Sequence, residues 1–111
     1  MVDRIPVIID TDMGVDDAYS VMLALSSPQL KVLGITTSYG NVSADGATVN
    51  AIKILELLEK RVRVAKGASG PLFGKIKKYS NSRGAFIHGK DGLGNMGHSL
   101  SDPVHVEVES D

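Results

Sequence analysis

Residues 5–18 of the chain read IPVIIDTDMGVDDA, an apolar run that leads directly into four aspartates. The run from Ile5 to Asp10 is short and β-branched, which predicts a buried strand with Pro6 tolerated near its start. The segment DAYSVMLALSS, residues 17–27, is rich in helix formers, and the following proline ends it. A strand that feeds an acidic turn and then a helix is the opening of an α/β unit.

The next segments repeat this alternation. KVLGITTSYG, residues 31–40, predicts a second strand, and RVRVAKG, residues 61–67, predicts a third. Between them, residues 43–60 predict a helix with Ser43 as its N-cap. Its apolar stripe has helical spacing and is expected to face the core: Val49, Ile52, Leu55 and Leu58. The alternation predicts an α/β fold with an open, mainly parallel, Rossmann-like sheet flanked by helices.

The periodicity fades after the third strand. Residues 67–101 hold many glycines and predict a loop far longer than usual connections, which is typical of a functional loop or of one that needs a partner surface. The tail, residues 102–111, alternates valines with polar residues. It fits a strand, or a segment whose packing partner lies elsewhere. We expect residues 1–111 to form a single domain.

The composition narrows the class of function. The chain has 111 residues, of which 42% are hydrophobic and 23% charged, as in soluble globular proteins. The net charge of −1 favours neither nucleic acid nor membrane as a partner, so charge-based function must be local. The absence of cysteine excludes disulfides and thiolate metal sites. Neither a signal-peptide core nor a membrane span is visible, and cytoplasmic localisation is expected.

The four aspartates predict a cation site. Asp10 ends the first strand, Asp12 follows it, and Asp16 and Asp17 begin the helix, at the sheet edge where α/β proteins bind ligands. Clustered carboxylates repel one another unless a cation neutralises them, and Ca²⁺ or Mg²⁺ prefers such oxygens. A water bound to the metal beside a carboxylate is a ready nucleophile. For Asp16 and Asp17 a plain role at the helix N-terminus is equally open.

Three segments resemble one enzyme family. DTDMGVDDA, residues 10–18, closely resembles the N-terminal signature of the inosine–uridine preferring nucleoside hydrolases, commonly D-x-D-P-G-x-D-D-A. Met13 replaces the proline, which is a conformational rather than a chemical departure. GITTSYGNVS, residues 34–43, and IHGKDGLGN, residues 87–95, resemble the second and third signatures in the same order. The resemblance implies the N-terminal part of the nucleoside hydrolase fold, about the first third of a typical member.

The resemblance also implies a reaction and a metal. Members hydrolyse the N-glycosidic bond of purine or pyrimidine ribonucleosides to base and ribose with a bound Ca²⁺, in nucleoside catabolism and salvage. By this resemblance Asp12 is the catalytic general base and a calcium ligand, and Asp17 is a second ligand. Asp10 supports the metal site from its inner or second layer of contacts.

Three further residues are implied to bind the ribonucleoside. By the resemblance, Asp16 bonds a ribose hydroxyl, Asn41 orients the water or the ribose, and His88 lies in the loop that covers the substrate. Each has a plainer interpretation, since Asn41 follows Gly40 as a turn residue would and His88 fits an ordinary loop histidine. A homo-oligomer is also expected.

The remaining ligands and base contacts of such a site are expected outside these 111 residues. Two carboxylates hold calcium incompletely, so the isolated chain is predicted to bind Ca²⁺ weakly and to have little or no activity. One alternative is a noncatalytic module that self-associates or binds a partner through exposed apolar sheet edges. Another is a haloacid-dehalogenase-like phosphatase, although Met13 and Gly14 stand where that family has Gly-Thr.

Overall fold

A computed structural model describes residues 3–75, 85–97 and 108–109. Strands and helices alternate along this part of the chain: β1 (Ile5–Thr11), α1 (Val15–Ser26), β2 (Leu30–Thr37), α2 (Ala44–Leu57), β3 (Arg63–Lys66) and β4 (Val108–Glu109). The sheet order is β1-β2-β3-β4, and each neighbouring pair is parallel. The predicted α/β class with a parallel sheet is therefore confirmed.

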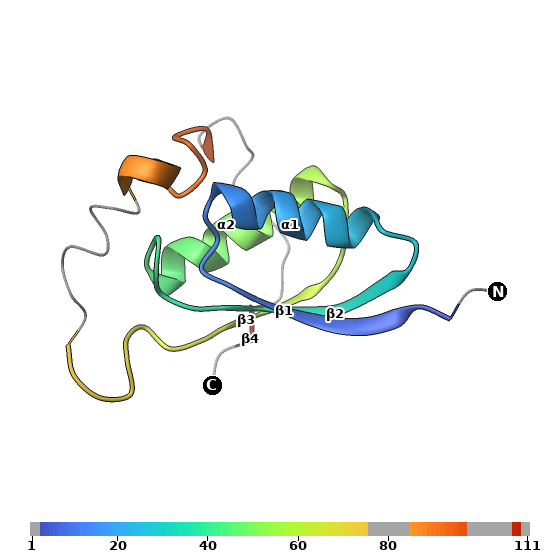
Figure 1. Ribbon diagram of the computed structural model, residues 1–111, viewed down its shortest axis with the longest axis horizontal. Coiled ribbons are helices and arrows are strands. Elements are labelled where there is room, and N and C mark those ends of the chain that lie inside the picture. Colours follow the sequence, from blue (N-terminus) through green and yellow to red (C-terminus); the bar gives the residue numbers. More distant parts are fainter. Residues whose placement is uncertain (1–2, 76–84, 98–107, 110–111) are drawn as a thin grey trace.

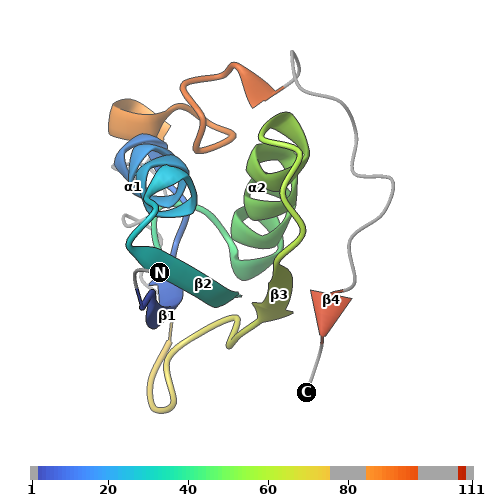
Figure 2. The ribbon, with the colours of Figure 1, turned by 90° about the vertical axis from the view of Figure 1, so that its right-hand side faces the viewer.

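Both helices lie on the same side of the sheet, as Figures 1 and 2 show from two directions. This follows from the connections, because successive strand–helix–strand units of one hand place their helices on one face. Among the described residues, no helix covers the opposite face. The carboxyl ends of β1 and β2 lie together, since the two strands, after a register shift between Val7 and Ile8, pair up to Thr11 and Thr37.

The core fills the space between the sheet and the helices. Residues of the sheet, of both helices and of the turn before α1 are buried there: Met13, Ala18, Val21, Ile35, Ala47, Ala51, Ile52, Ile54, Leu55 and Val64. Along β1, Ile9 packs against this cluster while its neighbour Ile8 is 66% exposed. This alternation is what a strand with one covered face shows.

The expected apolar stripe of α2 is right at Ile52 and Leu55 and wrong at Val49, which is 41% exposed. The helix instead turns Ala47 and Ala51 inward, and both are fully buried. Small side chains let the helix lie close to the sheet, so they select the inward face over a larger residue such as Val49.

Local signals at element ends agree with the structure in several places. Ser43 is the N-cap of α2, and its hydroxyl accepts the N–H of Gly46 at 3.1 Å. Within the predicted long loop, residues 85–88 form one helical turn and residues 89–97 form tight turns. Residues 76–84 and 98–107 lie outside the described part, but Val108 pairs with Val64, as a strand in the tail predicts. No helix in the described ranges is long and apolar enough to cross a membrane.

Candidate active site at the strand ends

Thr11 organises the turn between β1 and α1. Its side chain points to the buried helix side of the sheet, where its hydroxyl donates to Asp17 Oδ2 at 2.7 Å. The same oxygen accepts the N–H of Met13 at 2.9 Å. Met13 is fully buried and has a φ of 43°, a value that a proline ring does not reach. Met13 therefore has a backbone conformation that a proline at this position would not allow.

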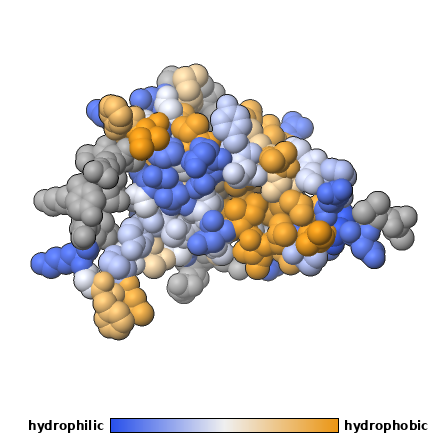
Figure 3. Space-filling view, viewed as in Figure 1, coloured by the Kyte–Doolittle hydropathy of each residue, from blue (hydrophilic) through white to orange (hydrophobic). Residues whose placement is uncertain are grey.

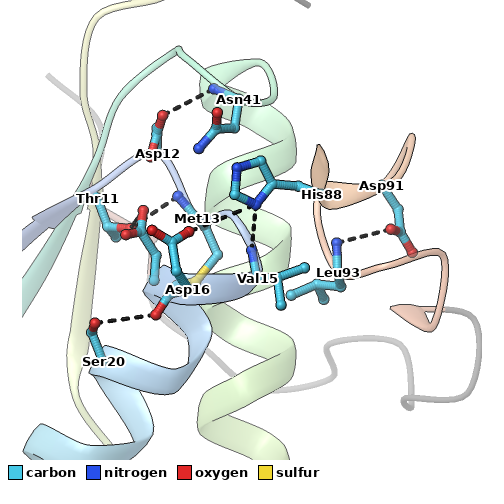
Figure 4. A network of polar contacts seen from close by, with 11 residues as sticks. Thr11, Asp12, Met13, Val15, Asp16, Ser20, Asn41, His88, Asp91 and Leu93 are labelled. Carbon is cyan, nitrogen blue, oxygen red and sulfur yellow. Dashed lines mark hydrogen bonds and ion pairs between the residues drawn. The ribbon is translucent and has the colours of Figure 1, made fainter. Parts of the chain in front are cut away.

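Asp12 ties the end of β1 to the end of β2. Its Oδ2 accepts the backbone N–H of Asn41 at 2.9 Å (Figure 4). Gly40 leaves room for this contact, because a Cβ at that position would collide with the Asp12 carboxylate. Glycine is thus required at position 40, shortly after β2, and the Asn41 N–H fixes the direction of the Asp12 carboxylate.

His88 closes the site from the loop of residues 85–97. Its Nδ1 accepts the N–H of Val15 at 3.0 Å and lies 3.6 Å from Asp16 Oδ1 (Figure 4). Its side chain is only 12% exposed. A Cβ on Gly14 would lie 2.6 Å from His88 Nδ1 and 2.9 Å from Asn41 Nδ2. The imidazole and the Asn41 amide therefore meet above Gly14, which has to be a glycine.

Asp12 and Asp17 form an interacting pair of carboxylates. Burial raises the pKa of Asp17, and a hydrogen bond with Asp12 together with repulsion by its charge raises it further, while the Thr11 hydroxyl opposes the shift. A proton between the two groups relieves the repulsion, and a hard divalent cation would relieve it in the same way. The donor chemistry of this pair therefore fits Ca²⁺.

The other two aspartates lie apart from this pair. Asp10 is exposed on the open face of the sheet, and its Oδ1 accepts the hydroxyl of Thr36 at 2.8 Å. The side chain of Asp16 is 78% exposed and faces His88. In residues 3–75, 85–97 and 108–109, no three acidic, histidine or cysteine side chains are arranged to hold a metal ion. A role for Asp10 at the metal stays a prediction.

Helix α1 begins without a side-chain cap of its own. Its N-cap is Gly14, and no side chain of that residue caps the helix. Asp16 and Asp17 lie inside the first turn, where negative charge suits the helix dipole, but neither is the cap. The cap-like acceptor is His88, which comes from 73 residues further along the chain.

Asp91 is a residue that the sequence did not single out. Its carboxylate accepts backbone N–H groups at 2.8–2.9 Å from three residues of its own loop: Leu93, Asn95 and Gly97. Although burial opposes the shift, these donors lower the pKa of Asp91. The Asp-Gly pair at positions 91 and 92 is a turn signal that marks the place but not the role.

Helix α2 fastens this loop from below. Asn50 is buried, and its Nδ2 donates to the carbonyl of Asp91 at 2.6 Å. Lys53, one turn further along, donates its Nζ to the carbonyl of Gly97 at 3.0 Å. Both anchors were missed by sequence reasoning, because their partners lie more than 40 residues away.

These features define a class of protein: an α/β protein whose candidate ligand site, with its carboxylates, lies at the carboxyl ends of parallel strands. The particular family is given by sequence comparison. Residues 7–110 match the model of the inosine-uridine preferring nucleoside hydrolase family, and the chain belongs to that family.

Individual relatives agree with this assignment. The chain is 44% identical over 103 residues to uridine nucleosidase 1 of Arabidopsis thaliana, covering 92% of the chain and 29% of that protein. It is 39% identical over 90 residues to the non-specific ribonucleoside hydrolase RihC of Klebsiella pneumoniae, covering 81% and 28%. The solved purine-preferring ribonucleoside hydrolase from Gardnerella vaginalis superposes with a TM-score of 0.82 at 37% identity, covering 95% and 33%. The chain thus spans about a third or less of these relatives.

Proposed function

We propose that this chain carries the aspartate-bearing part of a Ca²⁺-dependent ribonucleoside hydrolase site, which cleaves the N-glycosidic bond to release base and ribose. The observation that carries the proposal is the pair of held carboxylates beside the end of β1: the Asn41 N–H holds Asp12, and the Thr11 hydroxyl holds Asp17. The relatives support the reaction class, since their names state nucleosidase or ribonucleoside hydrolase activity.

Asp12 is the general base of the proposed reaction. One of its oxygens is held by Asn41, so the carboxylate has a fixed direction from which to take a proton from the attacking water. As the water adds to the sugar carbon, the bond to the base nitrogen breaks and its electron pair leaves with the base. Ionised carboxylates near the sugar stabilise the positive charge that develops on it.

Asp12 and Asp17 would hold calcium, with Asp10 in support behind them. When bound, Ca²⁺ supplies the positive charge that makes a water easier to deprotonate near neutral pH. The raised pKa of Asp17 supports this assignment: burial raises it, the neighbouring Asp12 raises it further, and a carboxylate pair in mutual repulsion gains from a cation.

Calcium takes about six to eight oxygens, so these side chains alone are expected to bind it weakly. Isothermal titration of the 111-residue chain with Ca²⁺ tests both the proposed ligands and the expected weakness of binding. We expect weak binding that is lost in Asp12→Asn and in Asp17→Asn, and retained in Asp45→Asn, whose carboxylate pairs with Lys66 instead. Tight binding by the chain alone would contradict the idea that its ligand set is incomplete.

Asp16, Asn41 and His88 surround the position proposed for the ribose. The Asp16 carboxylate is exposed and available to accept from a sugar hydroxyl. The Asn41 amide and the His88 ring approach each other above Gly14, so both are within reach of the same ligand. The substrate class that fits these groups is a ribonucleoside, whose sugar carries several hydroxyls.

A chimera tests the function despite the length of the chain. In the Gardnerella vaginalis hydrolase, the matched third is replaced by this chain, and release of base from inosine and uridine is measured. We expect Asp12→Asn in the chimera to lower kcat by about 10²–10⁴-fold, the usual contribution of a general base. Asp45→Asn is the control and should leave kcat unchanged. Full activity of the Asp12→Asn chimera would refute the proposed role, and rapid turnover by the 111-residue chain alone would refute its incompleteness.

A second candidate function, self-association or partner binding, is favoured by the open face of the sheet. Parallel sheets are normally covered on both faces, yet Ile8 and Leu33 are 66% and 48% exposed. Figure 3 shows apolar surface gathered where β1 lies in Figure 1. Native mass spectrometry should reveal oligomers that the double variant Ile8→Lys, Leu33→Lys abolishes. Leu23→Lys, on exposed surface of α1, is the control and should leave them intact.

A further inference from the structure

The His88 ring caps the N-terminus of α1 in place of a side chain at the N-cap position. The N-cap of α1, Gly14, has no side chain to receive the first free N–H groups of the helix. The N–H of Val15 donates instead to His88 Nδ1 at 3.0 Å. A ring nitrogen that accepts an N–H carries a lone pair, so in a neutral imidazole the proton is on the other nitrogen, Nε2.

The second nitrogen of the ring is turned toward the site. Figure 4 shows His88 between Val15 and Asn41, with Nδ1 toward Val15 and the other nitrogen on the side of Asn41. Asp16 is the charged group that faces Nδ1, at 3.6 Å. With Nδ1 occupied by Val15, the ring presents Nε2–H as a donor toward a ligand.

The loop that carries His88 is held at several points. The carbonyl of His88 itself accepts the N–H of Gly94 at 2.6 Å. Gly94 lies in the stretch whose N–H groups converge on the Asp91 carboxylate, and the carbonyl of Asp91 is bonded to the buried Asn50 of α2. Hydrogen bonds therefore link α2 to Asp91, Asp91 to the residues on both sides of Gly94, and Gly94 to His88.

We propose that Asp91 is a positioning residue: the loop that it closes holds the His88 ring against the Val15 N–H, which fixes the Nε2–H tautomer and aims a neutral donor at the ligand. The lowered pKa of Asp91 agrees, because an ionised carboxylate is the better acceptor for three N–H groups. This inference rests on the proposed function only for the nature of the ligand, an oxygen of a ribonucleoside.

Nitrogen-15 NMR of the 111-residue chain tests the proposal without any activity assay. At mildly alkaline pH, where an ordinary histidine is neutral, the ring signals that disappear in His88→Phe are those of His88. We expect these signals to show an unprotonated Nδ1 and a protonated Nε2. We also expect the Val15 amide to be protected from hydrogen exchange.

The decisive variant is Asp91→Ala. We expect mixed tautomers of His88 and a loss of Val15 protection of about fivefold, which corresponds to one typical hydrogen bond. The amide of Ile35, in the core, reports whether the fold survives, and Asp45→Ala is the matched surface control. Asp91→Asn keeps one acceptor oxygen and should give an intermediate loss, and it replaces the alanine variant if Ile35 protection collapses.

Two results would overturn the proposal. One is a wild-type His88 protonated on Nδ1, and the other is an Asp91→Ala chain with unchanged tautomer and unchanged Val15 protection. Neither result bears on the hydrolase activity of the chimera, so failure of this inference is distinguishable from failure of the proposed function.

Discussion

The two faces of the sheet differ in how deeply they bury the side chains of the same strands. On the helix side, Ile35 and Leu55 are fully buried between β2 and α2. On the other side, Ile8 and Leu33 are 66% and 48% exposed, with no described helix above them. One face of the sheet is thus buried under helices, whereas the other exposes large apolar side chains to solvent.

The contrast extends to the aspartates at the strand ends. Asp17 bonds Thr11 on the buried side, whereas Asp10 bonds Thr36 on the open side. Successive side chains of a strand point to opposite faces, so residues that are adjacent in sequence enter different environments. The covered face stabilises the chain by contacts within it. On the open face, the bond between Asp10 and Thr36 is exposed to water.

The largest effect is expected for the covered face. Leu55→Ala should lower the free energy of unfolding by about 2–5 kcal/mol, because it leaves a cavity in the core. Ile8→Ala, the same kind of truncation on the open face, should change it by less than about 0.5 kcal/mol. Urea unfolding of both variants measures the difference. Similar losses in the two would mean that the open face is packed in solution, and the comparison would fail.

A smaller effect of the same kind is expected for two threonines. Thr11→Val leaves the Met13 N–H without its acceptor in a buried turn, and should cost about 1–3 kcal/mol. Thr36→Val removes the matching hydroxyl on the open face, where water replaces it, and should cost less than about 0.5 kcal/mol. Thermal unfolding of the pair is the measurement. A Thr36→Val loss as large as that of Thr11→Val would show that Asp10 is buried against something in solution.

Much of the fold is legible in the sequence because its signals are local. The strand before Asp10, the Ser43 cap and the order of the elements depend on neighbouring residues, and they were predicted correctly. The predicted burial of that strand was wrong at Ile5 and Ile8, which are 59% and 66% exposed, because only one face of the sheet is covered by helices. The buried face of α2 was wrong at Val49, because that choice depends on how closely the helix approaches the sheet and hence on Ala47 and Ala51. Packing distance has no local signal.

The contacts of the candidate site also separate into those with a sequence signal and those without one. The contact of Asp12 with Asn41 follows from the rule that parallel strands end at one edge, so the sequence could place the two together. The bond between His88 and Val15 could not be foreseen, since it depends on a loop from 73 residues away. Asp91 and Asn50 were missed for the same reason, because an Asp-Gly turn and a helical asparagine look ordinary until the loop is folded onto α2.

Acid titration should separate two carboxylates by sign. The folded pKa of Asp17 is raised above the ordinary 3.8, so its ionisation costs stability as the pH rises from that value through the folded pKa. Asp17→Asn removes this loss. The folded pKa of Asp91 is lowered, so its contribution is present above 3.8 and disappears as the pH falls through the folded pKa. Asp91→Asn should therefore flatten the acid limb of the stability curve.

Urea unfolding between about pH 3 and pH 7 provides the measurement, and the two variants control for each other because their expected signs are opposite. Stability curves of Asp17→Asn and Asp91→Asn that deviate from wild type in the same direction would contradict the opposite pKa shifts of the two groups. Addition of Ca²⁺ should then weaken the Asp17 effect, since a cation replaces the proton between the carboxylates.

The smallest effect is expected at the rim of the covered face. Lys66, at the end of β3, pairs with Asp45 in the first turn of α2 at 2.8 Å, and the aspartate is largely exposed. An exposed ion pair contributes little, so Lys66→Ala should cost about 0.5 kcal/mol or less and become undetectable at high salt. Urea unfolding at low and high salt measures it. A loss comparable to that of Leu55→Ala would mean that charge at the rim, rather than apolar burial, holds α2 on the sheet. The difference in stability between the two faces would then come from the ion pair at the edge and not from the buried apolar side chains.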